Sequence, residues 1–368
     1  MARRFPEAED RRYKWALAKL GCCSGAHIQA DTTAAEIAIP ALSSDRCAGS
    51  LHACRQPLRK DTKLQTYDGF PGKRGSSYFV AAAALLVLLP AMLISFPDTC
   101  WAWGSDGHQI IAYIAADHLN PTARRRVAQI LGVANDPPSV AKAMGRAALR
   151  PDLEFRTSEP ETIDWHYINI CRQDTPADEQ ARCPNGACLT VEIDRFASDL
   201  RSGKKDGKWD SAAQLAFVIN FMGEIHQPLH AITNADMGGK CVGVDSPEPT
   251  NTLHSLWGEG LVSHLGRELH TRGPAETAAA LQRRFPDDNK NCPARPDIAW
   301  ASHQLAESEA YKPLGIPMQP CQPTACIKPK EAVKVSQAYL DREWMVVGRQ
   351  LAIGGYHLAA LLNAIWSH

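Results

Sequence analysis

The chain has 368 residues, and its 40 lysine and arginine residues balance its 40 aspartate and glutamate residues, so the formal net charge is zero. A neutral chain without a basic block is not suited to tight binding of duplex nucleic acid by counterion release. Residues 103–368 are enough for one large domain, and 45% of the whole chain is apolar, which is enough for a buried core.

An apolar run at residues 79–96 follows Lys73 and Arg74 and precedes the small residues around Cys100-Trp101-Ala102. This order of a basic, an apolar and a small-residue region is typical of a secretory signal peptide. We therefore expect residues 73–102 to be a signal peptide that is cut after Ala102, and the mature protein to be secreted or periplasmic. A membrane anchor through residues 79–96 is the alternative, because this run is just long enough to span a bilayer.

Residues 1–72 are unusual, because a signal peptide ordinarily begins a chain. They are polar and poor in aromatic residues. We expect them to be either a disordered extension or a segment upstream of the true start codon. If the apolar run is an anchor, the same residues would be a cytoplasmic tail.

Helical periodicity dominates residues 103–368, which we expect to form a single helical domain of the all-α class. Asn120-Pro121-Thr122 separates the first two helices, and the one short strand that we expect covers residues 165–170. Long loops rich in Pro, Gly and Asn lie at residues 171–188, 233–252 and 312–328. The expected helices cover residues 108–119, 123–131, 191–202, 211–225, 253–265, 277–285, 299–311 and 332–365, the last being one helix or two that meet at Gly354-Gly355.

The cysteines after residue 102 indicate a domain held together by disulfides, because export favours their oxidation. Cys183 could pair with Cys188, and Cys321 with Cys326, since each pair brackets a four-residue turn. Cys171 could pair with Cys292. The number of these cysteines is odd, and Cys241 would then remain as a free thiol.

Candidate metal ligands gather along one helix and the turn that follows it. Asn220 and Glu224 are four residues apart and therefore share a helical face. Pro228 ends this helix, so that His230 can turn into the same space. His254 begins the next helix. Taken alone, a histidine beside a tryptophan is more often a packed, hydrogen-bonded core residue than a metal ligand.

Further candidates lie upstream, at Asp152, His166 and His108. If the mature chain begins at Trp103, the free amine and the carbonyl of this residue can form a five-membered chelate. Imidazole, carboxylate and amine donors in one site suit zinc.

In this order the motifs resemble the secreted zinc-dependent single-strand nucleases of the S1/P1 type, whose helical fold is related to zinc phospholipase C. The resemblance covers essentially all of residues 103–368. It rests on W-G-x-x-G-H at 103–108, W-H-Y-I-N at 165–169, F-x-G-E-I-H-Q-P-L-H at 221–230, G-G-K at 238–240, L-H-S-L-W at 253–257, W-A-S-x-x-L-A-E-S at 300–308 and L-A-A-L-L-N at 358–363.

The resemblance implies up to three zinc ions. Trp103 and His108 would hold the first, with Glu224 bridging to the second. The second would also be bound by Asp152, His166 and Asn220, and the third by His230 and His254. Three positions depart from the family pattern, because Asn220 replaces a histidine, Glu224 replaces an aspartate, and Gly258 replaces an aspartate.

The implied activity is that of an endonuclease that cleaves single-stranded DNA or RNA to 5′-phosphorylated products through a zinc-activated hydroxide. A 3′-nucleotidase activity is compatible with the same site. Asp152 and Glu224 would be catalytic. Arg156 would contact the phosphate, from one position beyond the slot in which the family has an arginine. Tyr167 would stack on an unpaired base, and core packing is the alternative role for its ring.

We expect a monomer without a stable protein partner. Two other functions stay open. One is a zinc phospholipase C acting on lipid headgroups, and the other is a degenerate family member with reduced or no catalysis because Asn220 and Gly258 replace metal ligands.

Overall fold

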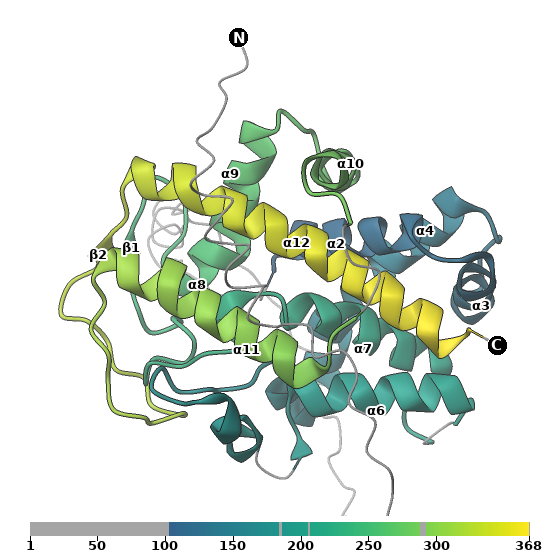
Figure 1. Cartoon of the computed structure of the whole chain (residues 1–368), viewed down its shortest axis with the longest axis horizontal. Coiled ribbons are helices and arrows are strands. Elements are labelled where there is room, and N and C mark those ends of the chain that lie inside the picture. Colours follow the sequence, from purple (N-terminus) through teal and green to yellow (C-terminus); the bar gives the residue numbers. More distant parts are fainter. Residues whose placement is uncertain (1–102, 184–185, 205–206, 288–291, 368) are drawn as a thin grey trace, which may run out of the picture. The chain divides into compact units, whose positions relative to one another are not determined.

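The computed structural model describes residues 103–183, 186–204, 207–287 and 292–367 (Figure 1). The expectations for the N-terminal extension, the signal peptide, its cleavage site and the alternative membrane anchor concern residues outside this part of the chain, so they stay predictions.

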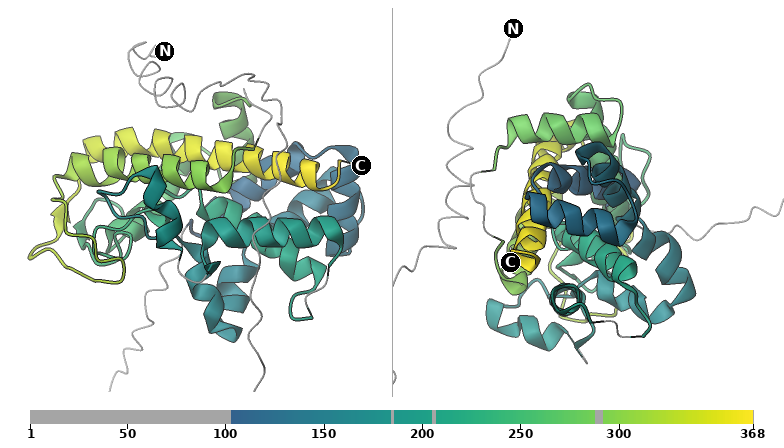
Figure 2. Two further views of the ribbon diagram at one scale, coloured as in Figure 1. Left: turned by 60° about the horizontal axis from the view of Figure 1, so that its bottom comes forward. Right: turned by 90° about the vertical axis from the view of Figure 1, so that its right-hand side faces the viewer.

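The described residues form a helical domain, which confirms the all-α class (Figures 1 and 2). Their strands are β1 (Val244–Asp245) and β2 (Val333–Lys334), a parallel pair of two residues each. The longer helices are α2 (Ser105–Asp117), α3 (Pro121–Leu131), α4 (Pro137–Ala147), α6 (Leu189–Ser202), α7 (Ser211–Glu224), α9 (Leu261–Glu268), α10 (Pro274–Arg284), α11 (Arg295–Leu305) and α12 (Gln337–Ile365). Short helical segments connect them, including α5 (Arg156–Ser158), α8 (Leu253–Ser255), and the π-helical turns Pro151–Phe155, Leu256–Gly260 and Ala306–Tyr311.

Helix α7 lies in the centre of the domain. Every residue from Ala213 to Glu224 is buried, so this helix is covered on all sides by its neighbours. Asp210 caps its first turn, because the Asp210 carboxylate accepts a hydrogen bond from the Ala213 amide at 2.8 Å. A polar side chain in α7 is therefore removed from water wherever it points.

Helix α12 is one continuous helix of 29 residues, although its sequence left a break at Gly354-Gly355 open. These glycines lie where α12 packs against α2. A Cβ atom at Gly355 would come within 2.5 Å of the Ile114 side chain, so glycine permits the close approach of the two helices. Helix α12 is also long and apolar enough to cross a membrane, but 72% of its apolar window is buried, as in a core helix of the domain.

Two local expectations were wrong. Helix α4 was not among the expected helices. Its first turn holds Pro137 and Pro138, where proline is well tolerated, and Asp136 caps the helix by accepting from the Ser139 amide at 2.9 Å. The strand expected at 165–170 does not form. Residues Pro160–His166 are a 3₁₀ helix, and the extended segment after it bonds to the chain around His230, with the Ile168 amide donating to the His230 carbonyl at 2.8 Å.

Two of the three disulfides among the described residues join loops that are distant in sequence. Cys183–Cys188 is confirmed, with 5.3 Å between the Cα atoms, but the Cys321–Cys326 pair is wrong. Each of these two cysteines instead reaches another loop, in Cys171–Cys321 and Cys241–Cys326. The expected Cys171–Cys292 pair and free Cys241 are therefore wrong as well, and Cys292 is the free cysteine among the described residues.

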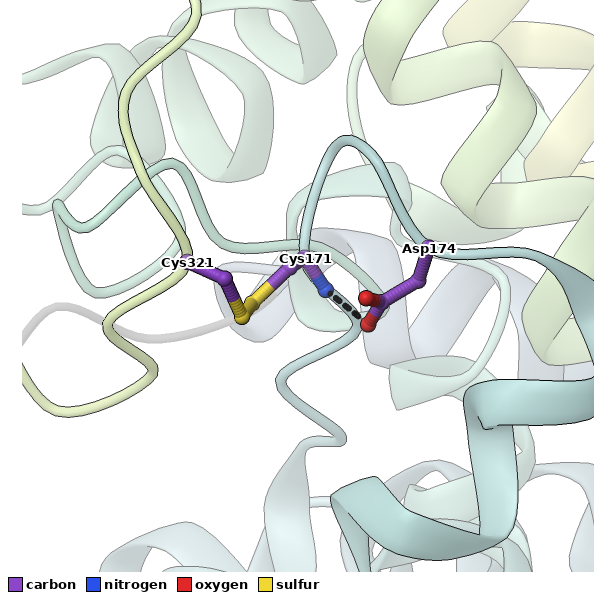
Figure 3. Close-up of side chains that lie close together, drawn as sticks. All are labelled: Cys171, Asp174 and Cys321. Carbon is purple, nitrogen blue, oxygen red and sulfur yellow. Dashed lines mark hydrogen bonds between the residues drawn. A yellow bond between two sulfur atoms is a disulfide. The ribbon is translucent and has the colours of Figure 1, made fainter.

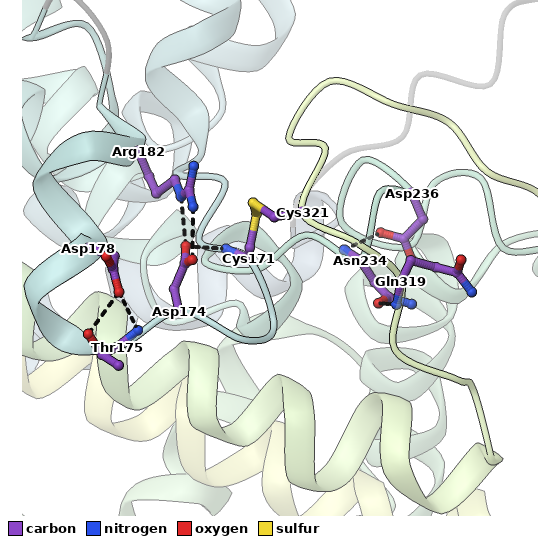
Figure 4. The surroundings of a disulfide bond; sticks show 9 residues. All are labelled: Cys171, Asp174, Thr175, Asp178, Arg182, Asn234, Asp236, Gln319 and Cys321. Atoms are coloured by element: carbon purple, nitrogen blue, oxygen red, sulfur yellow. Dashed lines mark hydrogen bonds and ion pairs between the residues drawn. A yellow bond between two sulfur atoms is a disulfide. The ribbon is translucent and has the colours of Figure 1, made fainter.

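Asp174 lies beside the Cys171–Cys321 disulfide (Figure 3), where its carboxylate accepts a hydrogen bond from the Cys171 amide at 2.8 Å. Arg182 donates to the same carboxylate at 2.6 and 2.8 Å (Figure 4). The carboxylate is thus fully engaged in a structural role, and the sulfur atoms are bonded to each other, so this group is not a metal site. The three disulfides are typical of a protein that folds in an oxidising compartment.

Candidate metal centre

Helix α7 supplies two polar side chains to one buried site. Asn220 and Glu224 are fully buried, and their four-residue spacing places both on the same side of the helix, as expected. The chain turns directly after Glu224, and Pro228 begins the 3₁₀ turn that ends at His230. This turn brings the Nδ1 atom of His230 to 3.3 Å from the Glu224 carboxylate.

Asp152 lies in the π-helical turn Pro151–Phe155 and faces Asn220. The Asn220 amide nitrogen donates to the Asp152 carboxylate at 2.7 Å and to the Ala148 carbonyl at 2.9 Å. Arg156 donates to the other Asp152 oxygen at 3.0 Å. Asn220 is therefore a hydrogen-bond donor that holds Asp152 in place, at the position where the family pattern has a histidine.

His108 and His166 complete this group from α2 and from the 3₁₀ helix. His166 Nδ1 is 2.7 Å from Glu224 Oε1 and 3.5 Å from Asp152 Oδ1. His108 Nε2 is 3.6 Å from Asp152 Oδ2 and 3.9 Å from Glu224 Oε2. The structure thus brings together His108, Asp152, His166, Asn220 and Glu224, which the sequence had placed in one site.

Several polar atoms in this group are buried without a hydrogen-bond partner. They are both ring nitrogens of His108, Nε2 of His166, Oδ1 of Asn220 and Oε2 of Glu224. Buried polar groups without partners are rare in folded proteins, because each costs about 1–3 kcal/mol. His108, Asp152 and Glu224 each offer one ligand atom within 4.8 Å of the other two, and this convergence of imidazole and carboxylate atoms fits a metal ion.

His230 and His254 form a second, adjoining pair whose geometry also fits a cation. His230 Nδ1 donates to the His166 carbonyl at 2.7 Å, and His254 Nδ1 donates to the Gly238 carbonyl at 2.8 Å. In a neutral imidazole this leaves Nε2 with a lone pair, and the two Nε2 atoms face each other at 3.1 Å. Two nitrogen ligands of a tetrahedral zinc are separated by about 3.3 Å, given Zn–N bonds of about 2.0–2.1 Å.

The pKa values in the site favour this chemistry. Burial lowers the pKa of His166 and of His254 to about 3, and burial together with His254 holds the pKa of His230 well below its ordinary value. These histidines are therefore neutral, which is the form that binds metals. Burial and the adjacent Asp152 raise the pKa of Glu224, and a dication beside this carboxylate would have the opposite effect.

Trp103 lies against the same site. Its indole is fully buried, and Nε1 donates at 2.8 Å to the carbonyl of Gly223, the residue before Glu224. The next amide, that of Gly104, donates to the Gly258 carbonyl at 3.0 Å. These contacts fix the backbone of Trp103 between α7 and the π-helical turn Leu256–Gly260.

Tyr167 and Lys240 extend the site beyond the buried group. Tyr167 is half-buried, and its hydroxyl donates to Asp164 at 2.5 Å. Burial, followed by this bond to Asp164, raises the pKa of the Tyr167 hydroxyl. The ammonium of Lys240 lies 5.9 Å from the centre of the Tyr167 ring. Sequence reasoning assigned no role to Lys240, although the G-G-K motif marked its position.

Comparisons with known proteins show which proteins this chain resembles. Endonuclease 2 of Arabidopsis thaliana is 25% identical over 292 residues, which cover 77% of this chain and 97% of that protein. Endonuclease 1 of the same plant is 22% identical over 310 residues, which cover 79% of this chain and 96% of that protein. Nuclease S1 of Aspergillus oryzae is 25% identical over 177 residues, which cover 47% of this chain and 58% of that protein. The family described as S1/P1 Nuclease matches residues 103–367, well over half of the sequence, and the chain therefore belongs to the S1/P1 nuclease family.

Proposed function

We propose that this protein is a zinc-dependent endonuclease that cleaves single-stranded DNA or RNA. Membership in a nuclease family supports the coarser assignment of a phosphodiester hydrolase. The observation that carries the finer assignment is the convergence of His108, Asp152 and Glu224, whose ligand atoms lie within 4.8 Å of one another, next to the facing Nε2 atoms of His230 and His254 at 3.1 Å.

The proposed zinc ligands follow from the donors that face one another. His108, with the amine and carbonyl of Trp103, would hold one ion. Asp152 and His166 would hold another, with Glu224 shared between these two. His230 and His254 would hold a third. Zinc bound there supplies a Lewis acid, which lowers the pKa of a water molecule and stabilises negative charge on the phosphate.

The protein side chains would orient these ligands and the substrate. Asn220 lacks the imidazole of the family pattern, and its amide nitrogen holds Asp152 through the 2.7 Å hydrogen bond. Arg156 and Lys240 carry the positive charges beside the site and would bind the phosphate. The Tyr167 ring would stack on an unpaired base, which a duplex does not offer, and each such contact contributes about 1–3 kcal/mol.

The first proposed site depends on a mature chain that begins at Trp103, with residues 73–102 removed as a signal peptide and residues 103–368 forming the nuclease domain. Two observations support this boundary. The family match starts at residue 103, and Trp103 is buried against Gly223 beside the proposed ligands. The disulfides support export to an oxidising compartment.

The test is cleavage of a labelled single strand and of the matching duplex by the purified mature protein, before and after removal of metal. We expect zinc-dependent cleavage of the single strand into fragments with 5′-phosphate ends. His166→Ala should lose activity and bound zinc, whereas His118→Ala should keep both, because His118 bonds to Gln282 away from the site. A zinc-free protein or an active His166→Ala variant would exclude the proposal.

The two alternative functions predict different zinc contents or different substrates. A degenerate family member would hold one zinc or none, and would leave the single strand intact. A phospholipase would release phosphorylated headgroups from phosphatidylcholine vesicles and spare the nucleic acid.

A further inference from the structure

Helices α3 and α4 concentrate positive charge in a chain that is neutral as a whole. Residues 118–150 contain six basic residues and one acidic residue, Asp136, which is engaged as the cap of α4. The two helices pack against each other (Figure 1). The zero net charge of the whole chain therefore conceals a local excess of cations. The basic residues of this segment are Arg124, Arg125, Arg126, Lys142, Arg146 and Arg150.

Three of these cations form a line along α4, which we call the α4 track and which consists of Lys142, Arg146 and Arg150. Residues four apart lie on the same face of a helix, with a rise of about 6 Å from one to the next. Lys142 and Arg146 are exposed and Arg150 is half-buried, whereas Val140 and Met144 on the other face of α4 are buried. The track therefore faces solvent.

The charges of the track are largely free to bind an anion. Among the described residues, no acidic side chain pairs with Lys142 or Arg146. Arg150 pairs with Glu154 at 2.9 Å, and its guanidinium lies 4.9 Å from the centre of the Phe155 ring. These contacts hold Arg150 in place, and Glu154 neutralises only this last member of the track.

The track leads to the proposed metal centre. Helix α4 ends at Ala147, and the carbonyl of the next residue, Ala148, accepts a hydrogen bond from Asn220 at 2.9 Å. The following turn carries Asp152, to which Arg156 donates at 3.0 Å with 20% of its own side chain exposed. Because Arg156 would bind the phosphate at the metal centre, the α4 track continues a line of cations away from that phosphate.

A row of exposed cations beside a nuclease site matches the backbone of the substrate. A nucleic-acid strand carries one negative charge per nucleotide, and proteins bind single strands without sequence preference through positively charged grooves that follow this backbone. Contacts with phosphates position the strand and carry no sequence information. A strand held at Arg156 would bring its next phosphates along α4.

We propose that the α4 track binds the phosphate backbone of the single strand on one side of the bond that is cleaved. This inference rests on the proposed endonuclease function. Long strands should accordingly be better substrates than a dinucleotide, whose single phosphate occupies the metal centre and does not reach α4. The advantage should be independent of sequence and should shrink as the salt concentration rises.

The experiment compares the zinc-loaded mature protein with the double variant Lys142→Gln, Arg146→Gln. The measured quantity is kcat/KM for a single strand of about 12 nucleotides and for a dinucleotide, at several salt concentrations. Each lost phosphate contact lowers the salt slope of single-strand binding by about 0.7, so two lost contacts lower it by about 1.4. At about 50 mM salt this corresponds to a loss of up to about 60-fold for the long strand, through KM. The dinucleotide should be cleaved at the wild-type rate.

Arg283→Gln together with Lys334→Gln is the matched control. It removes one arginine and one lysine that are likewise exposed, on α10 and on β2. In Figure 1, β2 lies at the left of the domain and α4 at the right. This control should keep the wild-type kcat/KM and salt slope for both substrates.

The outcomes separate this inference from the proposed function. An unchanged kcat/KM of the α4 double variant for the long strand, or an equal loss for both substrates, would overturn the track. If that variant cleaves like the wild type but loses binding to phosphatidylserine vesicles, the cations of α4 bind an anionic membrane surface instead. If the wild type cleaves neither substrate, the proposed function fails. The strand then stays intact, and fluorescence anisotropy decides whether the double variant binds it more weakly.

Discussion

Asn220→His restores the imidazole that the family pattern has at the centre of the site. The structure predicts that this change lowers the thermal stability of the metal-free protein and raises that of the zinc-bound protein. The Asn220 amide holds both Asp152 and the Ala148 carbonyl, at 2.7 and 2.9 Å. A histidine that donates one nitrogen to Ala148 has its other nitrogen free for zinc, which is the arrangement of His230 and His254. Without zinc, however, the bond to Asp152 is lost.

The cost in the metal-free protein follows from that bond. A hydrogen bond to a charged group contributes about 1.5–3 kcal/mol. At roughly 2–4 °C per kcal/mol for a domain of this size, the melting temperature should fall by about 3–12 °C in the presence of a chelator. With zinc the added ligand should reverse this loss, because metal binding free energy adds to the free energy of folding.

Thermal unfolding with and without zinc, together with a zinc competition titration, measures both effects. Asn220→Ala is the matched control, since it removes the same hydrogen bonds without supplying a ligand and should stay destabilised when zinc is added. If Asn220→His and Asn220→Ala respond to zinc alike, residue 220 does not face the metal, and the second proposed zinc is not bound beside Asp152.

Three further changes test other parts of the reasoning. One alanine inserted before Trp103 converts its amine into an amide, so it should remove one zinc and most of the activity while leaving the circular dichroism spectrum unchanged; an active variant would rule out the amine as a ligand. Gly258→Asp adds a carboxylate four residues after His254, so zinc should bind about tenfold more tightly in a competition titration; an unchanged affinity would place this side chain outside the site. Gly355→Ala puts a methyl group 2.5 Å from Ile114 and should cost about 1–3 kcal/mol in urea unfolding. Gly266→Ala is its control, because that methyl group meets only Thr271 Oγ1 at 3.8 Å, and equal stabilities of the two variants would contradict the close packing of α12 on α2.

The sequence predicted the helices well where one face is apolar and a cap is present. Asn120 ends one helix and caps the next, and its side chain accepts from the Ala123 amide at 2.8 Å, as the local pattern indicates. The strand expected at 165–170 was wrong up to His166, which ends a 3₁₀ helix, and the extended segment after it bonds to the chain around His230, 64 residues away. The pairings of Cys321 and Cys326 were missed because short spacing suggested that they pair with each other, while the fold places each of them beside a different loop.

The candidate site could be named from motif order, but its internal geometry could not. The role of Asn220 depends on the position of the Ala148 carbonyl, which lies 72 residues earlier in the chain. The facing Nε2 atoms of His230 and His254 depend on two backbone carbonyls that fix both rings. Neither arrangement can be inferred from local spacing, so sequence alone could not show that Asn220 donates hydrogen bonds to Asp152 and to the Ala148 carbonyl.

The last prediction concerns the stability of the metal-free protein in acid. His226 Nε2 and His357 Nδ1 lie 2.9 Å apart, between α7 and α12. Burial lowers the pKa of His226 to about 4, and burial together with the His226 ring lowers the pKa of His357 to about 2. In the unfolded chain both take up protons near pH 6.5, so folding stability is complete above this pH and is lost as the pH falls below it.

The free energy of unfolding of the wild type changes with pH through opposing contributions. Burial raises the pKa of Glu343 to about 8, so this carboxyl already holds its proton in the folded state, and it opposes the loss of stability in acid that the histidines cause. The difference between wild type and His357→Gln isolates a single histidine. Between about pH 7 and pH 5, the free energy of unfolding of the wild type should fall by about 2 kcal/mol more than that of the variant. Each pH unit below 6.5 costs about 1.4 kcal/mol for a histidine whose pKa is lowered in the folded protein. Urea unfolding at the two pH values with a chelator present measures this difference. Equal losses in the two proteins would mean that His357 is protonated in the folded state, and that the contact with His226 is between an imidazolium and an imidazole.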